Sequence, residues 1–246
     1  SQNLDNLRHS AAHLLAAAVM QLWPKAQRTI GPAIENGFYF DFDFGDTKIS
    51  ETDFPKIEKA MAKILPTWKG FERHELKPNA AKAEYPGNSY KHELIDEFAT
   101  EGQILSFYKS GNYWDLCAGG HIDHPDQELK HFKLLSVAGA YWRGDEKNTM
   151  LTRIYGTVFP TKEKLDKYLW QQEEAKKRDH RKLGRELDLF HFSDLVGSGL
   201  PLFTPKGALV RRLLQQHVND LQKGIGYQEG WAPQLTRAKL VNTAGH

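Results

Sequence analysis

The order of short apolar segments over the first 160 residues limits the fold more than any other feature of this sequence. From Phe38 to Phe44, aromatic and acidic residues alternate, which predicts a strand with one buried face. Helical spacing of apolar residues over 4–22 predicts a helix with Asp5 as its N-cap and Pro24 beyond its end. We expect further strands at 71–76, 104–109, 132–138, 140–143 and 150–157, with a turn at Gly139 between two of them. We expect further helices at 53–65, 79–85 and 91–99. Because strands and helices are interspersed without a regular βαβ alternation, we expect an α+β fold with antiparallel strand pairing.

The pattern changes at Thr161, where a long run of charged residues begins. We expect one helix from Thr161 to about Leu187, then a glycine-rich loop and a second helix over 206–223. The chain stops at His246, directly after a glycine, which is typical of a truncation inside a domain. We therefore expect a first domain over 1–160, a linker helix over 161–186 and the truncated beginning of another domain over 187–246.

The composition excludes several classes of protein. Hydrophobic residues make up 40% of the sequence and charged residues 26%, as in soluble globular domains. No apolar run approaches the roughly 20 residues that span a bilayer, so we expect no membrane partner. Cys117 is the single cysteine, which excludes an internal disulfide and fits a reducing compartment, the cytoplasm. The net charge of only +2 means that any nucleic-acid surface is a local patch.

Two short motifs carry groups that can do chemistry. His9 and His13 lie four residues apart on the expected first helix, so both imidazoles point to the same side. Cys117 and His121 enclose Ala-Gly-Gly, whose small residues permit a tight turn. Together the motifs offer three imidazoles and one thiol, a set that can bind Zn²⁺ tetrahedrally. Each pair alone is more typical of surface or core side chains, but both motifs in one short domain favour a functional site.

Longer segments give these motifs a specific context. The two motifs together resemble the signature of the editing domains that threonyl- and alanyl-tRNA synthetases share. Three segments resemble the threonyl branch, namely Gly31-Pro-Ala-Ile-Glu-Asn-Gly-Phe-Tyr-Phe-Asp41, Leu135-Ser-Val-Ala-Gly-Ala-Tyr-Trp-Arg-Gly144 and Arg153-Ile-Tyr-Gly156. The chain thus resembles part of the class II threonyl-tRNA synthetase family, with an antiparallel-sheet editing domain and its linker helix over residues 1 to about 185.

Residues from about 186 resemble the beginning of a class II aminoacylation domain, an antiparallel α/β domain. Gly226-Tyr227 followed by Pro233 on an expected strand resembles class II motif 1, which in the family builds the dimer interface. We therefore expect the parent to be a homodimer through this region. The motifs that hold ATP in the family are not found in this sequence. The resemblance implies that ATP, Mg²⁺ and Zn²⁺ serve the parent ligase at sites outside this chain, which by itself is not expected to ligate threonine.

The resemblance also implies a substrate. In this family the editing domain hydrolyses serine that has been esterified by mistake to tRNA(Thr). Serine lacks one methyl group of threonine, and such a group is worth only about 1–3 kcal/mol in a binding pocket. A second, hydrolytic pocket that admits serine and excludes threonine corrects the error. We expect this chain to be such an aminoacyl-tRNA editing hydrolase.

The four motif residues are expected to form the centre of the hydrolytic site. Ester hydrolysis requires an activated water, and neutral histidines suit this task near pH 7. By the resemblance, His9 and His121 position water and transfer protons. His13 and Cys117 shape the pocket around the aminoacyl group.

Two charged residues complete the expected site. Lys91 is a candidate for holding the ribose, the oxyanion or the leaving oxygen. Asp115 precedes Cys117 by two residues on an extended segment, so both side chains face the same side. It is a candidate for holding the substrate amino group. The structural alternatives are a solvated helix residue for Lys91 and a surface turn residue for Asp115.

No cofactor is expected for the editing reaction. The alanyl relatives use the same set of ligands for zinc, whereas the threonyl relatives work through bound water. Because the longer segments are of the threonyl type, the resemblance implies that this site requires no metal.

Aromatic and basic residues supply candidate contacts to tRNA. Tyr39, Tyr141 and Trp142 can stack on the terminal adenine, although an aromatic core position is the stronger alternative for Trp142 than for Tyr39. The expected linker helix carries basic residues between Lys176 and Arg185, which can contact phosphates. Because acidic residues interleave with them, the pattern slightly favours a solvated helix over one that contacts tRNA.

Two other functions remain open on the sequence alone. A free-standing zinc-dependent protein of the alanyl editing type shares the short motifs but leaves the segment after 186 unexplained. A non-catalytic module for tRNA binding and dimerisation explains that segment but gives the histidines no role. Hydrolysis of seryl-tRNA distinguishes the editing enzyme from this module.

Overall fold

The computed structural model describes residues 2–197 and 199–230. The chain forms two compact units that divide between Leu169 and Trp170, and each unit is described by itself. The first unit contains every residue expected in the hydrolytic site.

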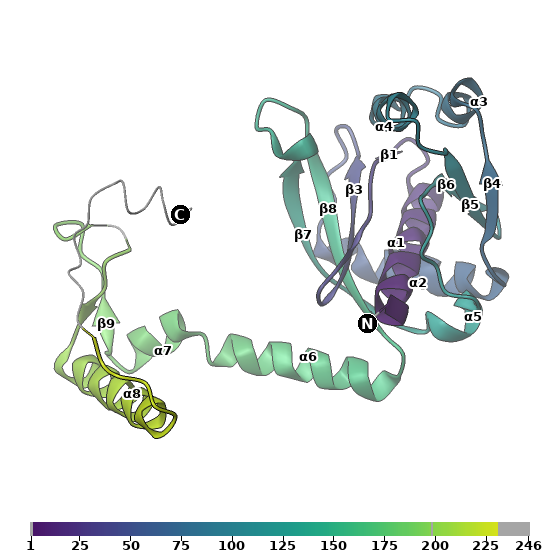
Figure 1. Ribbon diagram of the computed structural model, residues 1–246. Helices are drawn as coiled ribbons and strands as arrows, with labels where there is room; N and C mark the ends of the chain where they lie inside the picture. The colour runs from purple at the N-terminus through teal and green to yellow at the C-terminus, as the bar shows by residue number, and fades with distance from the viewer. Residues whose placement is uncertain (1, 198, 231–246) are drawn as a thin grey trace. The chain divides into compact units, whose positions relative to one another are not determined.

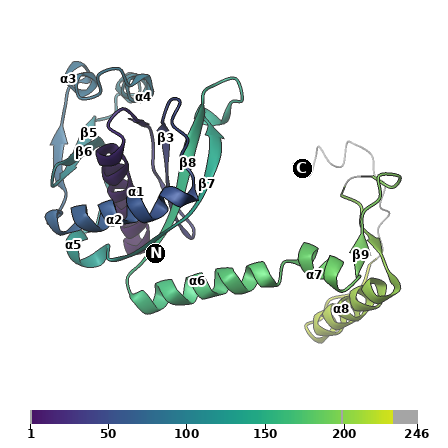
Figure 2. The same ribbon diagram turned by 180° about the vertical axis from the view of Figure 1, so that it is seen from behind.

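Helix α1 (Gln2–Leu22) is the centre of the first unit. Figures 1 and 2, which view the molecule from opposite sides, both show α1 between two sheets. Leu14 and Leu15 are fully buried, and several alanines between them and the helix ends let neighbouring elements approach closely. The helix expected over 4–22 is confirmed. The expected N-cap is wrong, because the helix begins three residues before Asp5, which lies in its first turn, where the helix dipole favours a carboxylate.

Five antiparallel strands form the larger sheet. They are β1 (Gln27–Arg28), β2 (Ala33–Ile34), β3 (Gly37–Asp43), β7 (His131–Tyr141) and β8 (Met150–Phe159), in the order β1-β3-β8-β7 with β2 also paired to β3. Phe38, Phe40 and Phe42 are buried in the core that α1 shares. Tyr39 and Asp41 alternate with them onto the opposite face of the sheet. The aromatic–acidic alternation therefore predicted this strand correctly.

The segment from 131 to 143 differs from expectation. Two strands with a turn at Gly139 were predicted, but β7 is continuous and carries a bulge between Leu134 and Ser136. Gly139 pairs with Thr152 within the ladder, and a side chain there would come within 2.9 Å of the Met150 sulfur. The glycine therefore makes room for a neighbour on β8 and does not form a turn. The reversal comes later, through the short 3-10 helix η3 (Trp142–Gly144) and the turn that follows it.

Three antiparallel strands form the smaller sheet of the first unit. They are β4 (Glu72–Glu75), β5 (Ser106–Ser110) and β6 (Tyr113–Leu116), in that order. Helices α2 (Phe54–Ile64), α3 (Pro78–Ala83) and α4 (Ser89–Thr100) confirm the three further helices expected from the sequence. The short 3-10 helices η1 (Glu51–Asp53) and η2 (Leu65–Thr67) flank α2. Strands β1 and β2 and helix α5 (Pro125–Glu128) were not expected, because elements of two to four residues have no measurable periodicity.

The expected linker helix is two helices. The first helix, α6 (Lys162–Lys177), ends shortly before Asp179. Asp179 is the N-cap of the second helix, α7 (His180–Glu186), and its side chain accepts a hydrogen bond from the Arg181 amide. The break follows from capping, since an aspartate in an N-cap position starts a new helix. Basic residues here pair with acidic neighbours at exposed positions, for example Lys177 and Arg178 with Glu174. These pairs are those of a solvated helix, and contact with tRNA stays a prediction.

The second unit contains a small hairpin and a long helix. β9 (Phe190–His191) pairs with β10 (Leu202–Phe203), and Thr204 caps α8 (Pro205–Gly224), which confirms the helix expected over 206–223. Apolar side chains along α8 are exposed in the described part of the chain: Leu209, Val210, Leu213, Leu214, Val218 and Leu221. Such a face is available for an interface, but the dimer through this region stays a prediction.

The strand expected for class II motif 1 is not found among the described residues that follow α8. The described residues after α8, 225–230, form no strand, and Pro233 lies outside the described residues. The assignment of motif 1 therefore stays a prediction. Within the described ranges, no helix is both long and apolar enough to pass through a membrane.

Two glycines allow β3 and β8 to lie in close register, and this closeness makes a testable prediction. A Cβ atom at Gly37 would lie 2.1 Å from the Gly156 carbonyl oxygen, so the backbone would have to move. We expect Gly37→Ala to lower the free energy of unfolding by about 1–3 kcal/mol, as overpacking does. Urea denaturation measures this. Gly70→Ala is the matched control, because its Cβ would meet only the Asp123 carbonyl at 3.6 Å. Equal stability of the two variants would contradict the prediction.

Candidate functional site

Helix α1 presents its two histidines to the smaller sheet. His9 and His13 lie one turn apart with their ring centres 4.8 Å apart, as the spacing in the sequence predicted. His13 is buried and packs edge-on against Phe71 and Tyr113. His9 is half-buried, so it can reach both the interior and the adjoining cavity.

The second motif is a turn that follows β6 and folds back against α1. Gly119 and Gly120 have φ angles of 107° and 85°, a backbone conformation that residues with a Cβ rarely adopt. The tight turn lets the Gly119 amide donate to the Cys117 sulfur at 3.3 Å. Ser10 of α1 holds the far end of the turn, because its hydroxyl bonds His121 Nδ1 at 3.3 Å and accepts from the Ile122 amide at 3.2 Å.

The two motifs meet in one cluster of side chains. His9 Nε2 lies 3.0 Å from Cys117 Sγ, which in turn lies 3.3 Å from His121 Nε2. His121 stacks on His9 with 4.7 Å between ring centres and on Phe71 with 3.9 Å. Residues more than a hundred positions apart in the sequence are therefore in direct contact, as the two motifs predicted.

Burial keeps the histidines of this cluster uncharged. Removal from water, and then the neighbouring His9, lowers the pKa of His121 to about 3. The pKa of His13 lies well below its ordinary value for the same first reason, with both neighbouring histidines adding to the effect. Burial also lowers the pKa of His9, although a hydrogen bond to the Gly31 backbone opposes it. All three imidazoles are therefore neutral near pH 7, and each has one lone pair available.

A buried ion pair lies beside the cluster. Lys91 Nζ, on α4, lies 2.9 Å from Asp115 Oδ1, on β6, and their side chains are only 3% and 1% exposed. Asn88 caps α4 and accepts from the Lys91 amide, which fixes the backbone of the lysine. Neither residue is the solvated or surface residue that the structural alternative proposed. Their catalytic roles stay predictions, but the structure places both against the histidine cluster.

Further donors saturate the Asp115 carboxylate. Tyr85 and Tyr113 donate their hydroxyl groups to its two oxygens at 2.5 and 2.8 Å, and Arg28 lies 3.3 Å from Oδ1. Burial alone would raise the pKa of Asp115, but Lys91 and then Arg28 hold it well below its usual range. The carboxylate is therefore ionised and fixed in orientation, which a buried ion pair requires if it is not to destabilise the fold.

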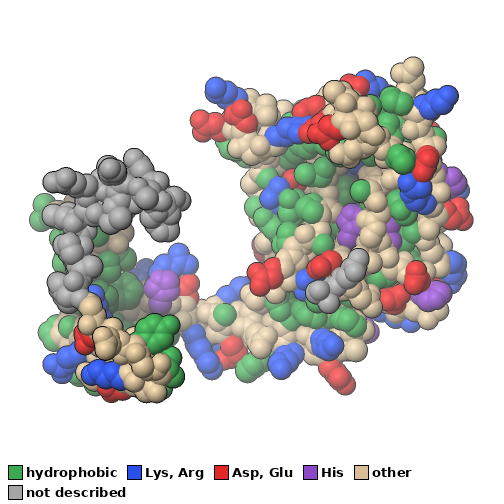
Figure 3. Space-filling model, viewed as in Figure 1, with side chains coloured by type: hydrophobic (Ala, Val, Ile, Leu, Met, Phe, Trp, Pro, Cys, Tyr) green, Lys and Arg blue, Asp and Glu red, His purple; other side chains and the backbone are tan. Residues whose placement is uncertain are grey.

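A cavity of about 260 Å³ adjoins these groups. Figure 3 shows histidine side chains in the middle of one face of the first unit, among apolar side chains. The polar residues that line the cavity are His9, His13, Thr29, Lys91, Gln103, Ser106, Asp115 and Cys117, and apolar walls come from Ile30, Pro32, Phe40, Leu94, Phe98, Ile104 and Leu116. A small, mostly apolar hollow with a few convergent polar groups is typical of a ligand site.

His121 is the one motif residue that does not line this cavity. It contacts Cys117, Ser10 and Phe71 instead. Its predicted part in positioning water therefore has to act through Cys117 and His9, and it stays a prediction.

The four side chains also have the arrangement that a metal ion needs. One potential ligand atom from each of His9, His13, Cys117 and His121 lies within 4.8 Å of the others. His13 Nδ1 is buried and has no hydrogen-bond partner among the described residues. Burial raises the pKa of Cys117 to about 11, so its sulfur is a protonated thiol near neutral pH. A metal ion would therefore fit the donor set but would have to displace this proton.

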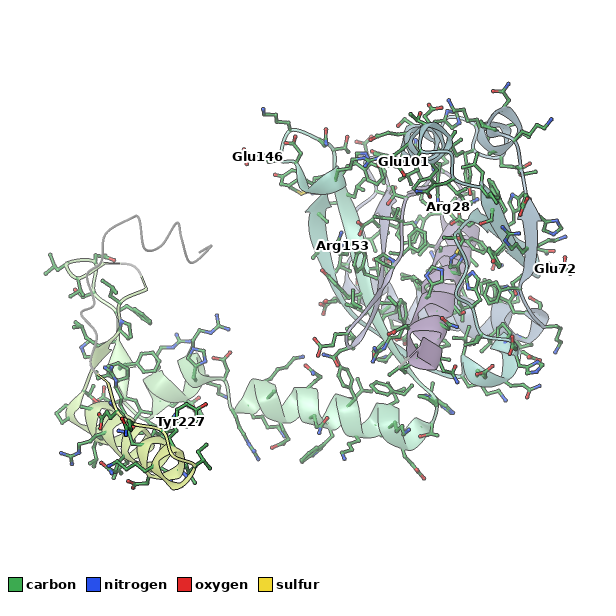
Figure 4. All side chains as sticks on the ribbon, in the orientation of Figure 1. Arg28, Glu72, Glu101, Glu146, Arg153 and Tyr227 are labelled. Carbon is green, nitrogen blue, oxygen red and sulfur yellow. The ribbon has the colours of Figure 1, made fainter. Side chains whose placement is uncertain are left out.

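The aromatic residues expected to stack on adenine lie apart from the cavity. Tyr39 is on the outer face of the larger sheet, where the Arg153 guanidinium lies 3.8 Å from its ring centre (Figure 4). Trp142 is buried and donates to Glu93, as the core alternative predicted. Tyr141 is 39% exposed at the end of β7. None of the three lines the cavity, and substrate binding by Tyr39 and Tyr141 stays a prediction.

Several residues of the site gave no signal in the sequence. Ser10 stands inside the first motif, and its position between two histidines was the one available clue to its role. Arg28 and Tyr85 lie in segments without a motif, and only the fold brings them to Asp115. The loop from Thr29 to Pro32 also lines the cavity, although no motif in the sequence marks it as part of the site.

Part of the first unit matches a known family of protein domains. Residues 105–155, which include the second motif, match the family described as the threonyl and alanyl tRNA synthetase second additional domain. The chain is 50% identical over 252 aligned residues to a threonine–tRNA ligase of Gloeobacter violaceus and 49% identical to one of Anoxybacillus flavithermus. It is 46% identical to threonine–tRNA ligase 1 of Bacillus subtilis.

These alignments cover 99–100% of the chain but only 38–39% of each relative. The similarity thus extends over both units, and it includes the helices and the hairpin that follow the editing-type domain. The chain spans a little under two fifths of the length of these relatives. It therefore belongs to the threonine–tRNA ligase family.

Proposed function

We propose that this chain hydrolyses the ester between serine and the terminal ribose of tRNA(Thr). The observation that carries the proposal is the cavity of about 260 Å³ in which neutral histidines, a thiol and a buried lysine converge. The match to the second additional domain of threonyl and alanyl tRNA synthetases supports it, because it covers the strands and the turn that bear Asp115 and Cys117.

His9 is the residue best placed to activate water. It lines the cavity, and its imidazole is neutral near pH 7 because burial lowers its pKa. A neutral imidazole can accept a proton from water as the water attacks the ester carbonyl and can then give the proton to the leaving ribose oxygen. His121 stacks on this ring and, through Cys117, limits its rotation.

Lys91 is the residue best placed to stabilise negative charge. The tetrahedral intermediate of ester hydrolysis carries an oxyanion, and a fixed positive group in a water-poor site stabilises it strongly. Burial lowers the pKa of Lys91, but Asp115 opposes this effect and keeps the pair together. Asp115 is held by several partners, and its first role is to hold Lys91. Contact with the substrate amino group is a second role that we propose for it.

The apolar walls give the cavity its means of selection. Serine and threonine differ by one methyl group, and exclusion by steric conflict discriminates more strongly than the about 1–3 kcal/mol gained by binding that group. Ile30, Pro32 and Phe40 line the same cavity as His9. We propose that the wall formed by such residues leaves no space for the threonine methyl.

We propose that the reaction requires no metal, since His9 and Lys91 provide both tasks that hydrolysis needs. If zinc binds, His9, His13, Cys117 and His121 would hold it, because their ligand atoms lie close enough together. The zinc ion would then act as a Lewis acid and lower the pKa of a water molecule.

The activity of the whole protein is a proposal as well. Its relatives are named as threonine–tRNA ligases, and the chain spans 39% of one of them. We propose that the parent binds tRNA(Thr), uses ATP with Mg²⁺ and Zn²⁺ to attach threonine at sites outside this chain, and corrects serine errors with the site described above.

Hydrolysis of two substrates tests the proposed function directly. Seryl-tRNA(Thr) and threonyl-tRNA(Thr) are incubated separately with the 246-residue chain, and the remaining aminoacyl ester is measured over time. We expect rapid loss of the serine ester and survival of the threonine ester, because the cavity wall excludes the additional methyl group. Equal hydrolysis of both esters, or of neither, would refute the proposal.

Replacement of the two contacting histidines tests their roles. We expect His9→Ala to lower the rate of seryl-tRNA hydrolysis by roughly 10²–10⁴-fold, the usual effect of losing a general base. His121→Ala should cause a smaller loss, because His121 does not line the cavity. His74→Ala is the control, since His74 lies half-exposed on β4 outside the cavity. A wild-type rate for His9→Ala would remove this residue from the mechanism.

Treatment with a chelator separates the water mechanism from the zinc mechanism. We expect dialysis against a strong chelator to leave the rate of seryl-tRNA hydrolysis unchanged, because His9 and Lys91 act without a metal. Elemental analysis of the same sample reports its zinc content. One zinc per chain, with activity lost on its removal and restored on its return, would show that the zinc mechanism operates.

A further inference from the structure

The Asp115 carboxylate is shared between two cations, although one lysine would neutralise it. Lys91 Nζ lies 2.9 Å and Arg28 Nε 3.3 Å from the same oxygen, Oδ1. The Arg28 side chain is only 16% exposed, and its guanidinium lies over the rings of Tyr85 and Tyr113 at 5.0 and 5.5 Å. A buried charge of this kind is costly unless it is held by several partners. The second cation therefore calls for an explanation.

Arg28 is bonded at both ends to elements that carry the site. Its Nη2 donates to the Trp114 carbonyl on β6 at 3.0 Å, next to Asp115. Its own carbonyl accepts from the Asn88 side chain at 2.9 Å, and Asn88 in turn caps α4 at the Lys91 amide. Because Arg28 belongs to β1, this one residue joins the larger sheet to β6 and to the first turn of α4.

Arg28 is excluded from contact with the substrate. It does not line the cavity beside His9 but lines a separate hollow of about 620 Å³ together with Tyr113 and Trp114. Figure 4 shows it inside the first unit beside α1 and between the two sheets. Its influence on hydrolysis therefore has to pass through the residues that it holds, namely Asp115, Trp114 and Asn88, and through them to Lys91.

The charges of Arg28, Lys91 and Asp115 indicate how Arg28 affects hydrolysis. Lys91 and Arg28 together carry +2 and Asp115 carries −1, so the group as a whole carries +1. Without Arg28 the group would be neutral, and Asp115 would attract Lys91 alone. With Arg28 present, the negative charge of the carboxylate is shared between two cations, so that part of the positive charge of Lys91 stays available to the cavity.

We propose that Arg28 is a positioning residue for the ester hydrolysis, which shares Asp115 with Lys91 and so leaves part of the positive charge of Lys91 uncompensated at the cavity. This inference rests on the proposed function. It assigns to Arg28 no contact with substrate and no proton transfer. Arg28 affects kcat, because it helps Lys91 to stabilise the oxyanion, which forms only after the substrate has bound.

Replacement of Arg28 in the full 246-residue chain tests the proposal by its kinetics. We expect Arg28→Met, which keeps an apolar stem of similar length, to lower kcat for seryl-tRNA by about 10–100-fold with little change in KM, as a displacement of a catalytic group by about 1 Å does. Arg28→Lys should recover most of the lost kcat, because it restores a second cation next to Asp115. Both variants are compared per folded molecule after thermal melts.

A second arginine provides a matched control. Arg143 pairs with Glu93 and Glu97, on the same helix α4 that carries Lys91, and it does not line the cavity. We expect Arg143→Met to leave kcat unchanged. A kcat for Arg28→Met within about twofold of wild type, or an equal loss in Arg143→Met, overturns the proposal.

Crystal structures of the wild-type and Arg28→Met chains give an answer that does not depend on activity. We expect the Lys91–Asp115 pair to shift its position relative to the cavity when Arg28 is absent, because Asp115 then loses its contact with β1. If the wild-type chain hydrolyses neither ester, the proposed function is refuted. The comparison of the two crystal structures then still shows whether Arg28 positions Lys91 and Asp115. If Lys91 and Asp115 occupy the same positions in both structures, Arg28 does not position them and the inference is wrong.

Discussion

The ionised carboxylate of Asp115, buried in the interior of the first unit, is the interaction on which the rest of the site depends. Its side chain is 1% exposed, and such a charge is tolerated only when cations and hydrogen-bond donors surround it. Its partners come from four parts of the chain: Arg28 on β1, Tyr85 after α3, Lys91 on α4 and Tyr113 on β6. The requirement to satisfy one buried charge thus fixes the elements around the cavity relative to one another.

The same burial sets the state of the histidines. Removal from water makes the charged imidazole unfavourable, so His9, His13 and His121 all have a pKa below the ordinary value. The site therefore contains neutral bases next to a fixed positive charge. A base that can accept a proton, together with a cation that can stabilise an oxyanion, is the combination that ester hydrolysis needs. The fold contributes their placement, since it brings His9 and Lys91 to one cavity from distant parts of the sequence.

The sequence predicted the parts of this structure that local periodicity determines. The alternation over Phe38–Phe44 and the helical spacing over 4–22 gave the central strand and helix, and the two motifs gave the cluster of His9, His13, Cys117 and His121. It failed where tertiary contacts decide. The sequence favours a turn at Gly139, which instead makes room for Met150, and Asp179 divides a segment that the sequence predicts as one helix. Arg28 was overlooked, because its partner lies 87 residues away and no spacing rule connects them.

The choice between water and zinc at the cluster follows from the same charges. The four ligand atoms lie close enough for a metal, but a divalent cation would need Cys117 as a thiolate, and burial raises the pKa of that thiol to about 11. The group formed by Arg28, Lys91 and Asp115 adds one positive charge at the edge of the cavity, which repels a second cation and attracts an anion. The same charge would attract the oxyanion of the proposed intermediate, whereas the four ligand atoms lie close enough to hold a metal. That hydrolysis here requires no metal therefore stays a proposal.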